Sequence, residues 1–301
     1  MINGIIIIDK EPGFTSHDVV AKMRGICGQR KIGHTGTLDP AATGVLPVCL
    51  GSATKLCDLL TDHDKEYVAE LLLGTTTDTQ DTTGTVLATR PVTVSEEKVR
   101  EAIASFVGEY LQVPPMYSAL KVNGKKLYEL AREGREIERK ARPVSIRELE
   151  ILEMNLPVVK IRVACSKGTY IRTLCADIGD KLGCGGTMQS LRRTGVGRFG
   201  IEDTLTLGQL QSLKDAGRVM DCVIAVDRVF ADCPALHVSG AAVKLLENGN
   251  PFLPAQTTEG ITYAAGEQVR IYFPDGSFAG IYAYAPERKQ YKPVKMFLEK
   301  E

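Results

Sequence analysis

The sequence predicts an α+β fold around a mainly antiparallel, mixed sheet flanked by helices. Strand patterns follow one another along the chain with few strand–helix–strand crossovers. Residues 159–165 alternate apolar with polar side chains, as a strand with one buried face does. The chain has 301 residues, 44% hydrophobic and 25% charged, which gives room for two packed domains.

The first expected elements are a buried strand at residues 3–10 and a helix that Ser16 caps and Gly28 ends. Residues 67–73 predict the next strand. A second helix begins at Ser95, which two glutamates follow in the first turn. After two more strands, a third helix has apolar residues at helical spacing: Ile171, Leu174, Cys175, Ile178 and Leu182.

The composition changes after Cys233, and this change divides the chain into domains of residues 1–232 and 233–301. The second domain predicts a hairpin at residues 266–284, a last strand at residues 294–298 and one short helix. Such a set of elements is typical of a small β-barrel-like module. We expect its hairpin to bury its apolar face without the rest of the chain. The module can bind RNA, stabilise the first domain or form an oligomer.

The charges of the chain are segregated, although 37 basic and 37 acidic residues leave no net charge. Residues 58–109 hold 4 basic and 11 acidic residues, whereas residues 121–142 hold 8 and 4, and residues 160–198 hold 8 and 2. Segregation of this kind indicates a polyanionic partner such as RNA or DNA. A solvated charged face is the alternative.

Residues 121–142 are helical in tendency but have only a narrow apolar stripe. A segment that cannot bury a full face is either an insertion that docks on a partner or a solvated helical hairpin. Its basic residues are Lys121, Lys125, Lys126, Arg132, Arg135, Arg139, Lys140 and Arg142.

No motif in the sequence predicts a metal or a nucleotide cofactor. The eight cysteines form no Cys-x-x-Cys pair and have no histidine at zinc-ligand spacing, which favours reduced, buried thiols. No glycine-rich loop precedes a Lys-Ser or Lys-Thr pair. No apolar run reaches the roughly 20 residues that span a bilayer, and no signal peptide is evident, so we expect a cytoplasmic protein.

Residues 33–47 hold one carboxylate, Asp39, among residues that form turns. Gly36 and Gly44 give the backbone freedom, and Pro40 biases Asp39 away from helix. Such a loop can aim the carboxylate for chemistry. It can also be an Asx turn, in which Asp39 only binds its own backbone.

The whole string Gly-His-Thr-Gly-Thr-Leu-Asp-Pro-Ala-Ala-Thr-Gly-Val-Leu-Pro at residues 33–47 resembles the catalytic loop of the TruB family of tRNA pseudouridine synthases. The resemblance covers about residues 2–230 and includes five more segments: residues 9–16, 64–67, 77–84, 114–121 and 165–172. It implies a pseudouridine synthase fold, no cofactor, and conversion of the T-loop uridine at position 55 of tRNA to pseudouridine. It also suggests that the C-terminal module is a PUA domain.

The resemblance also implies roles for single residues. Asp39 is the catalytic carboxylate, and attack at C6 of the base or at C1′ of the sugar both stay open. Arg172 keeps Asp39 charged through two parallel hydrogen bonds. Tyr67 lies against the flipped uracil and could relay the C5 proton, although a plain core tyrosine is the alternative. Tyr170 packs around the same pocket.

Three further interpretations concern the RNA. His34 fits the position of a flat side chain that fills the space left by the extruded base. Lys10 supports either the Asp39 loop or a phosphate. Lys125 and Lys126 clamp the RNA together with the other basic residues of the insertion.

We therefore expect a monomeric enzyme that binds the T-arm of tRNA and needs no protein partner. An RNA-binding or RNA-folding protein without catalysis is the first alternative. A nucleoside or glycoside hydrolase is the second, but it requires a second carboxylate beside Asp39, and the loop contains none.

Overall fold

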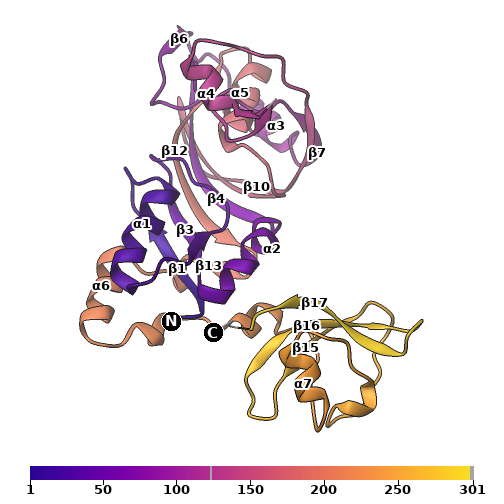
Figure 1. Cartoon of the computed structure of the whole chain (residues 1–301). Coiled ribbons are helices and arrows are strands. Elements are labelled where there is room, and N and C mark those ends of the chain that lie inside the picture. Colours follow the sequence, from indigo (N-terminus) through magenta and orange to yellow (C-terminus); the bar gives the residue numbers. More distant parts are fainter. Residues whose placement is uncertain (123, 299–301) are drawn as a thin grey trace.

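A mainly antiparallel sheet of nine strands runs through the first part of the chain (Figure 1). The computed structural model describes residues 1–122 and 124–298. The strand order is β1 (Gly4–Lys10), β3 (Thr43–Leu50), β12 (Gly186–Val196), β4 (Lys65–Leu73), β11 (Val158–Cys165), β10 (Arg142–Asn155) and β7 (Gly108–Gln112). In addition, β2 (Ile32–His34) pairs with β3, and β13 (Phe199–Gly200) pairs with β12. A short parallel pairing joins β12 to β3, so the predicted mixed, mainly antiparallel sheet is confirmed.

Helices cover the two halves of this sheet. Helices α1 (Ser16–Cys27) and α6 (Leu207–Asp215) pack on β1 and β3 around Ile6, Ile8 and Leu46. Helices α3 (Glu96–Ala104) and α5 (Ile171–Lys181) pack on β4 and β11. Figure 1 shows β12, β4 and β10 running between these two groups of helices. Short elements complete this part: η1 (Gly51–Leu56), α2 (Cys57–Thr61), β5 (Thr75–Thr77), β6 (Val86–Thr89), η2 (Ile201–Asp203), η3 (Val219–Cys222) and η4 (Val226–Phe230).

The prediction that Ser16 caps α1 is wrong by one residue. Thr15 is the cap, because its hydroxyl accepts the Asp18 N–H at 3.1 Å and the Asp18 carboxylate accepts the Thr15 N–H at 2.8 Å. Ser16 is instead buried, and its Oγ accepts the Leu38 N–H at 3.0 Å. The start of α1 is thereby bonded to the loop that contains Asp39.

Residues 121–142 contain less helix than their composition predicts. Strands β8 (Lys121–Val122) and β9 (Lys125–Lys126) form a small hairpin, and α4 (Leu127–Arg132) has only six residues. The helix stops where Gly134 takes a φ of 69°. The charged residues that follow offer little apolar surface to continue it, although Leu127 and Leu130 pack on Met116 in a small core of their own.

The C-terminal part has its own sheet, in the order β14 (Ala235–His237), β15 (Gln268–Tyr272), β16 (Phe278–Ala285) and β17 (Gln290–Met296). Helix α7 (Ala242–Glu247) and η5 (Pro254–Gln256) complete it. The last strand lies earlier than the predicted residues 294–298, because its register is set by pairing with β16. Among the described residues the edge strands β14 and β17 do not pair, so the sheet is open and no barrel is closed.

The C-terminal part does not bury all of its apolar surface on its own. It has a core around Tyr282, Tyr291 and Phe252, but Phe297 and Phe278 join a second core that contains Phe230. The ring centroid of Phe230 lies 6.0 Å from that of Phe297 and 6.5 Å from that of Phe278. The expectation of a hairpin independent of the rest of the chain is therefore wrong, and the gold strands in Figure 1 pack beside the first part.

No helix within residues 1–122 and 124–298 is long and apolar enough to cross a membrane.

Candidate active site

Asp39 lies in the loop that joins β2 to β3, and bonds to distant segments fix this loop. The Pro40 carbonyl accepts hydrogen bonds from the Lys10 Nζ at 3.1 Å and from the Gly13 N–H at 2.9 Å. Lys10 is fully buried, and its Nζ also donates to the carbonyls of Glu11 and Phe14. This geometry indicates that Lys10 holds the Asp39 loop in place.

The Asp39 carboxylate points to Arg172, the second residue of α5. Arg172 Nε lies 3.1 Å from Asp39 Oδ2, and the side chains are 6% and 42% exposed. A substrate can therefore reach the carboxylate while the cation stays behind it. Among the described residues the carboxylate makes no hydrogen bond to its own loop backbone, so the loop is not an Asx turn of the expected kind.

Arg172 contacts Asp39 through one nitrogen and not through two parallel bonds, which corrects the sequence-based expectation. Its Nη1 donates to the Thr79 carbonyl at 3.0 Å, and its Nη2 donates to the Tyr117 carbonyl at 2.7 Å. The Asp81 carboxylate lies 3.6 Å from Nη1. These partners fix the guanidinium plane, so Arg172 offers a rigid cation to Asp39.

Burial dominates the electrostatics of Asp39 and raises the pKa of its carboxyl above the usual range. The positive charges of Arg172 and Lys10 oppose this rise, whereas Asp81 adds to it. Burial also lowers the pKa of Lys10 to about 8. Asp39 is thus a carboxylate whose charge depends on the cations around it.

Two of the predicted site residues are tyrosines, one in β4 and one immediately before α5. Tyr67 in β4 is 9% exposed and shares its core with Leu38 and Ala42 of the Asp39 loop. Tyr170 immediately precedes α5, where Gln112 holds its backbone: the Tyr170 N–H donates to Gln112 Oε1 at 2.8 Å, and Gln112 Nε2 donates to the Tyr170 carbonyl at 3.0 Å. Burial raises the pKa of both tyrosines.

His34 ends β2, just before the loop. Its ring meets His17 edge-on at 5.0 Å between centroids. Burial lowers the pKa of His34 to about 4, so that its ring is neutral near pH 7. Its Nδ1 is buried without a hydrogen-bond partner among the described residues.

The two lysines of the insertion do not contact the Asp39 group. Lys125 Nζ pairs with Glu133 at 3.2 Å, and Lys126 Nζ lies 5.3 Å from the centre of the Tyr128 ring. The insertion is nevertheless joined to the site, because the Tyr128 N–H donates to the Ser118 carbonyl at 3.0 Å, next to the residue that binds Arg172.

Sequence reasoning missed three residues that build this site. Asp81 stands in the matching segment 77–84, but nothing there assigns its contact with Arg172. Arg193, whose Nη2 donates to the Gly36 carbonyl of the Asp39 loop, stands in the basic stretch 160–198, where charge alone did not distinguish it from solvated neighbours. Gln112 carried no signal, because its bonds to Tyr170 join the end of β7 to the start of α5, which is distant in sequence.

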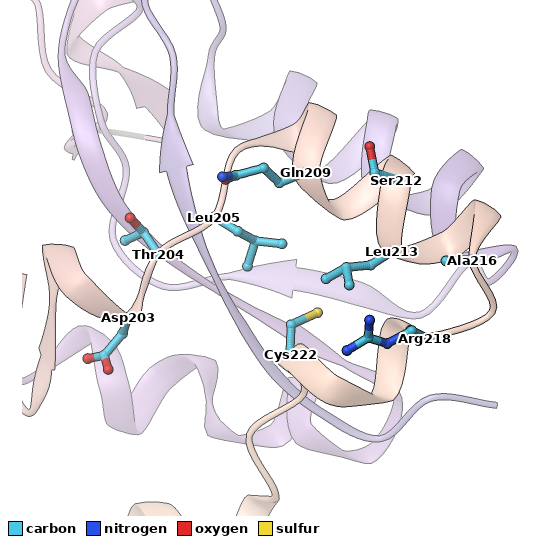
Figure 2. A pocket seen from close by; sticks show the side chains of 9 residues that line it. All are labelled: Asp203, Thr204, Leu205, Gln209, Ser212, Leu213, Ala216, Arg218 and Cys222. Atoms are coloured by element: carbon cyan, nitrogen blue, oxygen red, sulfur yellow. The ribbon is translucent and has the colours of Figure 1, made fainter.

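A separate hollow lies between η2, α6 and η3 (Figure 2). Its charged residues bond to near neighbours: Asp203 accepts the Gly200 N–H at 2.8 Å, and Arg218 pairs with Asp221 at 2.7 Å. None of the predicted site residues lines it, and we place the candidate active site at Asp39. The lining residues are Asp203, Thr204, Leu205, Gln209, Ser212, Leu213, Ala216, Arg218 and Cys222.

Family models match most of the first part of the chain. Residues 24–171 match the TruB family pseudouridylate synthase (N terminal domain), and residues 172–230 match the tRNA pseudouridylate synthase B C-terminal domain. A tRNA pseudouridine synthase B of Alkaliphilus oremlandii (strain OhILAs) is 46% identical and covers 100% of both chains. One of Lachnoclostridium phytofermentans (strain ATCC 700394 / DSM 18823 / ISDg) is 50% identical over 99% of this chain and 100% of that protein.

Solved structures agree with these matches. A chain in the crystal structure of a Cbf5-Nop10-Gar1 complex is 28% identical, with a TM-score of 0.73 over 98% of this chain and 85% of that one. A chain in an H/ACA RNP bound to a substrate RNA containing 2′-deoxyuridine is 26% identical, with a TM-score of 0.72 over the same shares. The fold is thus that of a pseudouridine synthase, an isomerase that acts on RNA. Within this class, the chain belongs to the TruB family.

Proposed function

We propose that this protein converts the uridine at position 55, in the T-loop of tRNA, to pseudouridine, with Asp39 as the catalytic carboxylate. The observation that carries the proposal is the ion pair between Asp39, which a substrate can reach, and the buried Arg172. Bonds from Lys10 and Ser16 fix the loop that holds Asp39. The full-length relatives named tRNA pseudouridine synthase B support tRNA as the substrate.

The reaction needs little more than a positioned carboxylate. The N1–C1′ bond breaks, the bound uracil turns, C5 bonds to C1′, and C5 loses the proton that N1 gains. No electron is transferred to a cofactor. The carboxylate attacks C6 of the base or C1′ of the sugar. Both routes require ionised Asp39, and the positive charge of Arg172 favours that form.

The neighbouring side chains have roles that suit a flipped uracil. Tyr67 lies against the base and relays the C5 proton, and Tyr170 closes the pocket beside it. His34, neutral and flat, stacks where the base leaves the loop of the RNA. Lys10 supports the loop through the Pro40 carbonyl.

The RNA is held outside the pocket by basic residues. Lys125 and Lys126, with the rest of residues 121–142, clamp the T-arm, and residues 233–301 act as a PUA-like RNA-binding domain. The protein works as a cytoplasmic monomer without a protein partner. The segregation of basic residues into 121–142 and 160–198 supports an RNA surface.

Asp39→Asn tests the proposal, because it keeps the shape of the side chain and removes its charge. Unmodified tRNA is incubated with the protein and no added cofactor, and pseudouridine is mapped along the RNA. We expect modification at position 55 by the wild type and none by the variant, with tRNA affinity within about tenfold. Asp232→Asn is the control, since Asp232 is 92% exposed and lies outside the site. Turnover by Asp39→Asn overturns the assignment of Asp39, and modification elsewhere overturns position 55.

A further inference from the structure

Arg193 in β12 is a buried cation at the centre of the sheet. It is 1% exposed, and no carboxylate lies within ion-pair distance of it in residues 1–122 and 124–298. A buried arginine without a counter-charge is costly unless its N–H groups all find acceptors. Its partners therefore indicate what the residue does.

The side chain of Arg193 reaches both ends of the Asp39 loop. Its Nε donates to the Val45 carbonyl at 2.7 Å, and its Nη2 donates to the Gly36 carbonyl at 3.2 Å. A Cβ at position 36 would lie 3.4 Å from Arg193 Nη1, and one at position 44 would lie 2.1 Å from the Arg193 carbonyl oxygen. Both glycines also have positive φ. The two glycines that flank Asp39 thus leave room for Arg193.

Arg193 also faces Tyr67. The two residues are direct cross-strand partners in the antiparallel pair of β12 and β4, so their side chains share a face of the sheet. The charge of the guanidinium opposes the rise that burial causes in the pKa of Tyr67, and the two side chains lie within hydrogen-bonding reach of each other. A hydroxyl that accepts from a cation keeps its own proton free for another acceptor. Arg193 therefore orients the phenol.

We propose that Arg193 is a positioning residue that holds the Asp39 loop and the Tyr67 hydroxyl in one fixed arrangement for the isomerisation. This inference rests on the proposed function, in which Asp39 and Tyr67 act on the uracil. Arg193 does not touch the substrate. It acts through the Gly36 carbonyl on one side and through the phenol on the other.

Arg193→Met, Arg193→Lys and Tyr67→Phe, alone and combined, test this role in the full chain. The readout is the single-turnover rate on tRNA, beside tRNA affinity and thermal unfolding. We expect Arg193→Met to lower the rate about 100-fold with affinity within about threefold, since it removes charge-assisted bonds on the loop and the phenol. Lysine keeps the positive charge but cannot reach all the acceptors of the guanidinium. Arg193→Lys therefore lowers the rate less than Arg193→Met does.

The double variant separates positioning from bulk stability. If Arg193 acts through Tyr67, the effect of Arg193→Met is at least about tenfold smaller in the Tyr67→Phe background. Tyrosine labelled with ¹³C at Cζ gives a second readout: the Tyr67 resonance, identified by its loss in Tyr67→Phe, shifts in Arg193→Met and titrates at higher pH. If the rate losses of the two single substitutions multiply in the double variant and the Tyr67 resonance does not change in Arg193→Met, the proposal is wrong.

Arg100→Met is the control, because Arg100 is an exposed arginine of α3 that lies outside both basic stretches and pairs with Glu96 at 3.5 Å. It is expected to keep the rate within about threefold. If Arg193→Met does not fold, Arg193→Lys is the test instead. A wild-type single-turnover rate for Arg193→Lys then overturns the proposal. If Asp39→Asn is inactive while the Arg193 variants keep the wild-type rate, only this inference fails. If Asp39→Asn is active, the proposed function fails instead.

Discussion

Replacing Phe297 by alanine tests how the C-terminal part is attached. Phe297 is 4% exposed, although it follows the last strand of its own sheet. Its ring lies 6.0 Å from Phe230 in the first part and 5.7 Å from Phe278. The substitution therefore removes a side chain that both parts of the chain share.

The expected loss follows from this burial. Truncating a buried phenylalanine to alanine costs about 3–5 kcal/mol, and part of this is the loss of ring contacts worth about 0.5–1.5 kcal/mol each. We take the lower end of this range, about 3 kcal/mol, as the minimum loss for this buried ring. That corresponds to a fall in melting temperature of roughly 5–10 °C.

Differential scanning calorimetry of the full chain measures this effect. Because Phe297 and Phe230 share one core, the two parts are expected to unfold in one transition that moves as a whole. Val294→Ala, in the strand that precedes Phe297, is the control, since Val294 is 53% exposed and should change stability by no more than about 0.5 kcal/mol. A Phe297→Ala curve like that of Val294→Ala, or a separate small transition that moves alone, refutes the shared core.

Three further predictions address the site. Burial lowers the pKa of His34 from 6.5 to about 4, so its contribution to stability is complete above pH 6.5 and is lost as the pH falls toward 4. His34→Gln should therefore remove about 2 kcal/mol of the difference in unfolding free energy between pH 7 and pH 4.5, measured by urea unfolding, and an unchanged difference contradicts this. Reversing the charges of Lys125 and Lys126 should weaken tRNA binding and lower the slope of log affinity against log salt by about 1–2, whereas an unchanged slope shows that neither lysine meets a phosphate. Lys10→Met should destabilise the protein by at least about 2 kcal/mol and lower the rate more than the affinity, because the Pro40 carbonyl and two others lose their donor; a loss of affinity alone would instead assign Lys10 to a phosphate.

The centre of the site was predictable because its residues lie in contiguous segments. The loop at residues 33–47 identified Asp39, and the segment at residues 165–172 supplied Arg172. The number of bonds between them was not predictable, because the carbonyls of Thr79 and Tyr117 occupy the other guanidinium nitrogens. Those carbonyls come from segments whose approach only the tertiary structure determines.

The errors in the fold have a similar cause. Thr15 and Ser16 are both good caps, and the bond from Leu38 to Ser16 Oγ decides between them. An apolar strand pattern shows that one face is buried but not which element covers it. For this reason the sequence did not reveal that Phe278 packs on another part of the chain.

The core that holds Phe297 also contains Ile5 and Ile7, so residues from opposite ends of the sequence complete one cluster. During synthesis, β1 leaves the ribosome long before residue 297 does. Leu56, Leu60 and Phe230 belong to the same cluster and are made earlier, but the part of the face that Phe297 covers stays open to water, or to a chaperone, until nearly the whole chain has been made. Such distant contacts slow folding, since the intervening chain must be ordered before they form. We infer that the nascent protein passes through a stage in which α1 has docked on one face of β1 while the opposite face waits for its last partner.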